Sequence, residues 1–144
     1  MRVVICGSRS IKGEDAITQI DAAIKKFNVK VDEVISGGAE GVDTAAIEWA
    51  KRNNIDYVVF PANWKKWNKA AGYKRNEKMA WYADQPRIFL LHSGTEEEDI
   101  KEDFRGAILA IWNGSSKGTA NMIEIGKRYD LKVFVSVETE VQNA

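Results

Sequence analysis

Three segments of the sequence are rich in glycine and small polar residues, which is the composition of turns that bind anions. Glycines let a ligand approach the main chain closely. The first N–H groups of a helix are unpaired and carry partial positive charge, so a phosphate placed there receives several hydrogen bonds without many basic side chains. We therefore expect phosphate-binding chemistry, provided that the turns meet at one edge of the fold. The segments are residues 7–10, 36–43 and 113–119.

Each of these turns follows an apolar, β-branched run, and segments with helical periodicity lie between most of the runs. Strands that alternate with helices predict an α/β fold of the Rossmann-like, doubly wound type, with a mainly parallel sheet of about five strands and helices on both faces. The runs are near-continuous, as in strands buried on both faces. Such sheets bind ligands beyond the carboxyl ends of their strands, where the strand order reverses. The expected strands are residues 2–6, 33–35, 57–60, 108–112 and 132–135, and the expected helical stripes lie within 16–27, 42–50 and 122–129.

The composition is that of one ordinary globular domain spanning residues 1–144. The chain is 44% hydrophobic and 29% charged, with a formal net charge of zero, which indicates neither disorder nor a strongly basic nucleic-acid binder. No signal-peptide pattern opens the sequence, and no apolar run approaches the roughly 20 residues needed to cross a bilayer. We expect a cytoplasmic protein without a membrane partner.

Cys6 and His92 are the only cysteine and the only histidine. A lone cysteine excludes an intrachain disulfide, and inside an apolar run it is typical of a small buried side chain. A zinc site needs several such ligands. We therefore expect no metal site and no cofactor.

Charge is distributed unevenly along the chain. Residues 64–78 combine aromatic with basic side chains, and residues 96–103 are strongly acidic. Aromatic rings among cations hold nucleobases, but a helix of the same composition also covers a core edge while its lysines stay in water. Trp64 and Trp67 fit either role. The acidic block would repel nucleic-acid phosphates, and it could pair with the basic block within a chain or between copies, which leaves a homo-oligomer open.

The combined order of the motifs resembles the SLOG superfamily, and most closely its small stand-alone members of the YspA-like type. Besides the three turns, the resemblance includes residues 61–64 (PANW) and 70–76 (AAGYKRN). The superfamily also contains the DNA-processing protein Smf/DprA and the LOG (lonely guy) phosphoribohydrolases. The resemblance implies a Rossmann-like fold with a nucleotide or nucleotide-derived ligand at the glycine turns. For most small members it implies no established reaction.

Transferred position by position, the resemblance implies a ligand site that combines the three turns with the connection after the third strand. In this site glycines shape the turns, and Asp43 orients ribose hydroxyls or braces its loop. Ser116 or Thr119 could also cap the last helix. The implied ligand-binding residues are Gly7, Ser8, Arg9, Ser36, Gly37, Gly38, Glu40, Gly41, Asp43, Arg75, Asn76, Gly114, Ser115, Gly118 and Thr119.

One departure from the LOG pattern bears on catalysis. The LOG motif PGGxGTxxE ends in a glutamate that assists glycosidic cleavage, and Met122 stands at that position here. Glu124 lies two residues further along, and this step rotates it by about 200° around the helix. Glu40 and Asp43 remain as candidate acids, although acidic residues at a helix start also stabilise the helix. The catalytic group, if there is one, stays unknown.

A second departure is an insertion at about residues 85–105, between the helix that ends near Asp84 and the strand 108–112. Residues 87–91 are expected as an additional strand and residues 96–104 as a short helix. Additions of this kind can mediate assembly or cover a site, and the sequence does not choose between the two.

The leading hypothesis is a ligand-binding protein that senses or sequesters a nucleotide, for example a nucleotide second messenger or an ADP-ribose derivative. Neither GxxxxGK[ST] nor GxGxxG follows a strand intact, so an ordinary P-loop NTPase or nicotinamide dehydrogenase is disfavoured. A hydrolase that cleaves an N-glycosidic or phosphate bond through Glu40 or Asp43 is the alternative. Single-stranded nucleic-acid binding is the weaker third hypothesis, because the domain is not basic overall.

Overall fold

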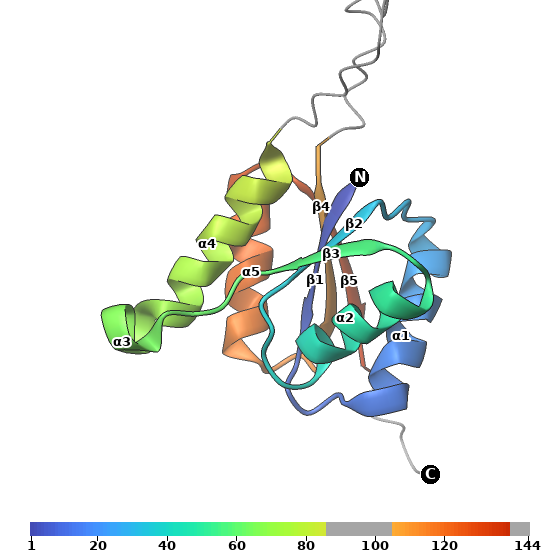
Figure 1. Ribbon diagram of the computed structural model, residues 1–144, viewed down its shortest axis with the longest axis horizontal. Helices are drawn as coiled ribbons and strands as arrows, with labels where there is room; N and C mark the ends of the chain where they lie inside the picture. Colours follow the sequence, from blue (N-terminus) through green and yellow to red (C-terminus); the bar gives the residue numbers. More distant parts are fainter. Residues whose placement is uncertain (86–104, 139–144) are drawn as a thin grey trace, which may run out of the picture.

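The structure, a computed structural model, describes residues 1–85 and 105–138 (Figure 1). Its elements alternate along the chain as the periodicity predicts. They are β1 (Arg2–Gly7), α1 (Gly13–Phe27), β2 (Glu33–Ser36), α2 (Val42–Arg52), β3 (Asp56–Val59), α3 (Trp64–Trp67), the 3₁₀ turn η1 (Asn68–Ala70), α4 (Ala71–Asp84), β4 (Ala107–Trp112), α5 (Lys117–Arg128) and β5 (Lys132–Val137).

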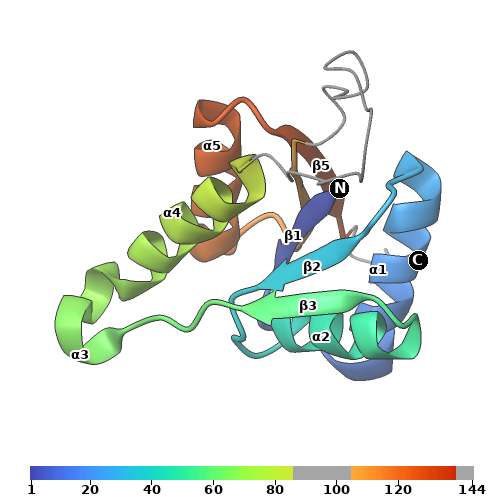
Figure 2. The ribbon, with the colours of Figure 1, turned by 45° about the horizontal axis from the view of Figure 1, so that its top comes forward.

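The five strands form one parallel sheet in the order β3-β2-β1-β4-β5. The chain first builds outward from β1 through β2 to β3, and then builds outward on the other side through β4 to β5. Helices α1 and α2 cover one face, and α4 and α5 cover the other (Figures 1 and 2). The predicted Rossmann-like, doubly wound α/β class is confirmed. The strand order reverses between β1 and β4, which is where such sheets bind ligands.

The two central strands hold this edge of the sheet in place. Along β1, Val3 and Ile5 pack into the core beneath α1 and α2, whereas Val4 and Cys6 pack into the core beneath α4 and α5. All four side chains are buried. β1 pairs in parallel with β4, from Val3 opposite Ala107 to Gly7 opposite Ile111, so the carboxyl ends of the two strands lie side by side.

The edge strands depart from the expectation of burial on both faces. Tyr57 and Val59 of β3 are 41% and 39% exposed, and none of the residues of β5 is buried. The prediction is wrong for these two strands because each has one neighbouring strand and lies at the margin of the helix layers. The third strand also begins and ends one residue earlier than predicted.

The expected helix that ends near Asp84 is α4, and the basic, aromatic-rich stretch forms α3, η1 and the start of α4. The strand expected at 87–91 and the helix expected at 96–104 lie outside the described residues. Within 1–85 and 105–138, no helix combines the length and apolar character needed to span a membrane.

Candidate functional site

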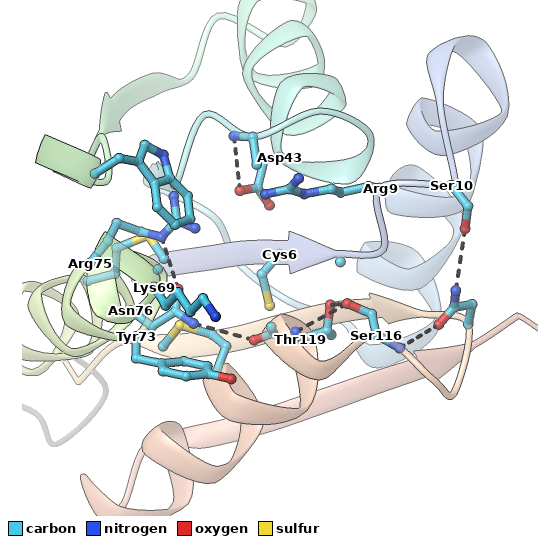
Figure 3. A pocket seen from close by; sticks show the side chains of 18 residues that line it. Cys6, Arg9, Ser10, Asp43, Lys69, Tyr73, Arg75, Asn76, Ser116 and Thr119 are labelled. Carbon is cyan, nitrogen blue, oxygen red and sulfur yellow. Dashed lines mark hydrogen bonds between the residues drawn. The ribbon is translucent and has the colours of Figure 1, made fainter. Parts of the chain in front are cut away.

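A cavity of about 500 Å³ opens at the carboxyl ends of β1 and β4, at the point where the strand order reverses. We call it the main cavity. Its walls come from the β1–α1 turn, the β2–α2 turn, the α3–α4 segment and the β4–α5 turn, as the close view in Figure 3 shows. The residues that line it are Cys6, Gly7, Arg9, Ser10, Ala39, Asp43, Trp64, Lys69, Gly72, Tyr73, Arg75, Asn76, Met79, Asn113, Ser116, Gly118, Thr119 and Met122.

The β2–α2 turn is closed by hydrogen bonds to Ser36 and Asp43. The buried Ser36 hydroxyl donates to the Asp43 carbonyl oxygen at 2.8 Å and accepts from the Gly38 N–H at 3.1 Å. The Ala39 N–H donates to Oδ2 of Asp43 at 3.3 Å. These bonds fix the Asp43 carboxyl in the wall of the main cavity, at the first turn of α2.

Asp43 is 6% exposed, and burial raises the pKa of its carboxyl to about 6. The positive charges of Arg75 and Arg9 and the Ala39 N–H oppose this rise without cancelling it. In Figure 3 the Arg9 side chain extends across the cavity towards Asp43. Cys6 lies beneath, and burial raises the pKa of its thiol, so it stays neutral at physiological pH. The main cavity therefore contains a carboxyl that titrates near pH 6 beside two guanidinium groups.

Helix α4 connects the β2 turn to α5 through Arg75 and Asn76. Nη1 of Arg75 donates to the Gly37 carbonyl oxygen at 2.7 Å, and its Nε donates to Oδ1 of Asn76 at 3.0 Å. Nδ2 of the buried Asn76 donates to the Gly118 carbonyl oxygen at 3.3 Å and to Oδ1 of Asn121 at 2.9 Å. Two opposite walls of the cavity are thus linked through one arginine–asparagine pair.

In the β4–α5 turn, the Asn113 side chain accepts hydrogen bonds from two main-chain N–H groups. Its Oδ1 accepts from the N–H groups of Ser115 and Ser116, both at 2.9 Å, and its Nδ2 donates to the Ser10 hydroxyl at 3.4 Å. Ser116 is the N-cap of α5, with its hydroxyl accepting from the Thr119 N–H. The cap expected at Ser116 or Thr119 is therefore Ser116.

The structure separates the predicted ligand-binding residues into two groups. Ser8 and Ser36 are fully buried. The Ser8 hydroxyl accepts from the Asn113 N–H at 2.9 Å, so both serines hold turns rather than face the cavity. Glu40 is 80% exposed, pairs with Lys12 at 3.8 Å and lies outside the main cavity. The residues brought together around the main cavity are Gly7, Arg9, Asp43, Arg75, Asn76, Gly118 and Thr119, and those outside it are Ser8, Ser36, Gly37, Gly38, Glu40, Gly41, Gly114 and Ser115.

Several lining residues were absent from the predicted set. Trp64 is 53% exposed and Tyr73 is 49% exposed, and both line the main cavity together with Lys69. The available signal was the alternation of aromatic and basic residues in 64–78, which does not by itself indicate that this segment lies over the glycine turns. Helix α4 packs beside α5, and this packing brings residues 64–78 over the glycine turns.

Among residues 1–85 and 105–138, no group of three or more His, Cys, Asp or Glu side chains is placed to hold a metal ion. Asp43 is the acidic residue in the wall of the main cavity. Carboxyl chemistry in the cavity therefore depends on this one side chain.

Residues 1–67 match the family model described as YspA, cpYpsA-related SLOG family. The predicted SLOG resemblance is thereby confirmed over the segment that contains β1, β2 and their turns. A search of curated proteins finds no match to the chain. Among solved structures, the chain is similar to DNA processing protein A (DprA) from Streptococcus pneumoniae, with 16% sequence identity and a TM-score of 0.48. The similarity covers 94% of this chain and 58% of that chain, so the present chain spans little more than half of that protein.

Proposed function

We propose that this SLOG-type domain binds a nucleotide or nucleotide-derived small molecule in the main cavity, and that it senses or sequesters this ligand. One observation carries the proposal: cations and aromatic rings lie together over the glycine turns, at the point where the strand order of the sheet reverses. SLOG membership over residues 1–67 agrees with a nucleotide-related role.

The charges around the main cavity favour an anionic ligand. Arg9, Lys69 and Arg75 contribute positive charge, and Asp43 opposes them. Gly118 lies in the first turn of α5, where the helix dipole adds to the attraction. Such a site suits phosphate groups.

The apolar parts of the cavity suit a base and a ribose. Trp64 and Tyr73 offer exposed ring faces against which a base can stack, and Met79 and Met122 form an apolar floor. The Asp43 carboxyl can accept hydrogen bonds from ribose hydroxyls. The cavity volume lies within the range of about 300–1,000 Å³ that is typical of small-molecule sites.

Binding without cleavage is favoured by Met122. This side chain is 1% exposed and lines the main cavity, where LOG enzymes are expected to place a glutamate. An apolar thioether neither donates nor withdraws a proton, so the acid of that reaction is missing from its position.

The test is calorimetry and thermal shift with a panel of nucleoside mono-, di- and cyclic phosphates. A ligand that binds only the folded state raises the unfolding temperature in proportion to the logarithm of its concentration. We expect a shift in the wild type and its loss in Arg9→Met. Arg128→Met, which removes an exposed arginine on α5 paired with Glu77, is the control. Absence of any shift at millimolar nucleotide would overturn the proposal.

A hydrolase is the second candidate, and the raised pKa of Asp43 favours it. A carboxyl that titrates near pH 6 can donate or accept a proton close to neutrality. Glu40, the other predicted acid, is turned towards Lys12. Incubation with nucleoside monophosphates and chromatography separates the two functions: release of free base or phosphate that disappears in Asp43→Asn indicates a hydrolase.

Single-stranded nucleic-acid binding is the third candidate function, and the observation that favours it is the exposed aromatic rings beside lysines. The ammonium groups of Lys66 and Lys74 each lie 4.9 Å from the ring centroid of Trp67, and Trp67 is 38% exposed. Binding to an oligonucleotide that weakens steeply with salt would support it. Binding of mononucleotides with little salt dependence would favour the main proposal.

A further inference from the structure

A second cavity of about 410 Å³ adjoins the main cavity. We call it the side cavity. Both cavities are lined by Arg9, Ala39, Trp64 and Arg75, so these residues form their junction. The rest of the side cavity is formed by Gly37, Gly38, Glu40, Pro61 and Ala62.

The junction between the two cavities is cationic. Arg75 is held there by its hydrogen bonds to the Gly37 carbonyl oxygen and to Asn76, so its guanidinium is already positioned. Arg9 comes from the opposite wall, at the end of β1, and is exposed. Two guanidinium groups that approach from different elements suit phosphate oxygens better than a single neutral group.

The far wall of the side cavity is made of small residues and one carboxylate. Gly37 and Gly38 have no side chains, and a Cβ at Gly38 would lie 2.9 Å from Cγ1 of Val59, so a side chain at this position would displace Val59. Glu40 can accept hydrogen bonds from hydroxyl groups, and Trp64 offers a ring face at the junction. A sugar combines hydroxyl groups with an apolar ring face, so it matches a carboxylate that lies near an aromatic ring.

We propose that the side cavity is a subsite for a sugar ring, and that the full ligand is a nucleoside diphosphate that carries this second ring. The nucleoside occupies the main cavity, the diphosphate lies between Arg9 and Arg75, and the sugar contacts Glu40 and Trp64. This inference rests on the proposed function, because it extends the same site. A nucleoside monophosphate leaves the side cavity to water.

The experiment compares three ligands of one base by calorimetry: AMP, ADP and ADP-glucose, with the uridine and guanosine series (UDP-glucose, GDP-mannose) measured in the same way. We expect the diphosphate sugar to bind about tenfold more tightly than the diphosphate, because one or two added hydrogen bonds supply about that factor. Equal or weaker binding of the diphosphate sugar in every series overturns the subsite. Absence of binding by every nucleotide overturns the proposed function itself, so the two failures are distinguishable.

Two variants test the location of the sugar. Ala62→Phe fills the side cavity from a residue that does not line the main cavity, and should remove the tenfold gain while leaving ADP affinity unchanged. Ile47→Phe, which adds the same ring in the groove between α1 and α2, is the control and should change neither affinity. Glu40→Gln alters an exposed side chain, so this variant should fold even if Ala62→Phe does not. It should weaken the binding of the diphosphate sugar and leave the affinity for ADP unchanged. A loss of ADP affinity in either cavity variant, or an unchanged gain in both, contradicts the location.

Discussion

Arg75 and Asp43 approach each other at Gly37, where neither leaves room for a side chain. A Cβ at Gly37 would overlap the Arg75 guanidinium, 2.7 Å from its Cζ, and would lie 2.8 Å from Oδ2 of Asp43. The glycine is buried, and its carbonyl oxygen accepts the Arg75 hydrogen bond. Because this one residue has no side chain, a cation from α4 and a carboxyl from α2 can lie close together in the wall of the main cavity.

The first prediction concerns this contact. Gly37→Ala should lower the free energy of unfolding by about 1–3 kcal/mol, because overpacking displaces groups that are fixed by hydrogen bonds. Nucleotide affinity should fall as well, since Arg75 is displaced. Denaturant unfolding and calorimetry measure the two effects.

Gly72→Ala is the matched control for Gly37→Ala. A Cβ at Gly72 would meet only ordinary contacts, 3.9 Å from Trp64 and 4.0 Å from Arg75. Because Gly72 lies in α4, alanine should stabilise the protein by up to about 1 kcal/mol through helix propensity. If both variants lose equal stability, the close approach at Gly37 is not the cause.

The second prediction concerns pH. The folded-state pKa of Asp43, about 6, is higher than the ordinary aspartate pKa of 3.8 because of burial. Between these values the folded state binds more protons than the unfolded state, so the free energy of unfolding falls as pH rises from about 4 to 6 and levels off above. Ionised Asp43 therefore costs stability at neutral pH, and Asp43→Asn should recover about 1–3 kcal/mol there.

Urea unfolding at pH 5 and pH 7.5 measures this difference for the wild type, Asp43→Asn and the control Glu124→Gln, an exposed carboxyl on α5. The stability gained in Asp43→Asn should be larger at pH 7.5 than at pH 5. A gain that is equal at both pH values, or a loss that grows with pH, would contradict the buried carboxyl. The protonated form also repels a phosphate less, so nucleotide affinity should rise below pH 6.

The architecture could be predicted from the sequence because it depends on periodicity. Near-continuous apolar runs such as 108–112 predicted central parallel strands, and glycine turns after three strands predicted the edge of the sheet at which the main cavity opens. These signals are local, and the rule that parallel strands present their carboxyl ends together converts them into a three-dimensional statement.

The directions of individual side chains could not be predicted in the same way. Ser8 and Ser36 follow strands in polar turns, as a ligand contact would, yet both are buried and bind main-chain atoms. Whether a residue after a strand points inward depends on the register and on the turn conformation, and composition reports neither. The role of Trp64 could not be predicted either, because its place at the main cavity depends on how α3 and α4 lie relative to the sheet.

The third prediction concerns Asn76, which is 5% exposed. Asn76→Ala should lower the free energy of unfolding by about 1–3 kcal/mol, because the Gly118 carbonyl oxygen and Nε of Arg75 each lose a buried hydrogen-bond partner. Thermal or urea unfolding measures this loss. Gln85→Ala removes an exposed amide that donates to the Trp81 carbonyl oxygen, and should change stability by less than about 0.5 kcal/mol. Similar losses in the two variants would argue against a buried connection between α4 and α5.

The fourth prediction concerns the start of α5, where two adjacent serines have different roles. The Ser116 hydroxyl accepts from the Thr119 N–H at 3.4 Å and lies 3.0 Å from its hydroxyl oxygen, whereas the Ser115 hydroxyl donates to Asn113 in an exposed turn. Ser116→Ala should therefore cost about 1 kcal/mol of stability, the usual effect of losing an N-cap, and Ser115→Ala should cost a few tenths. Because Ser116 lines the main cavity and Ser115 does not, Ser116→Ala should weaken nucleotide binding more than Ser115→Ala. Urea unfolding and calorimetry on the pair measure both differences, and a larger effect in Ser115→Ala would show that Ser116 is not the N-cap of α5.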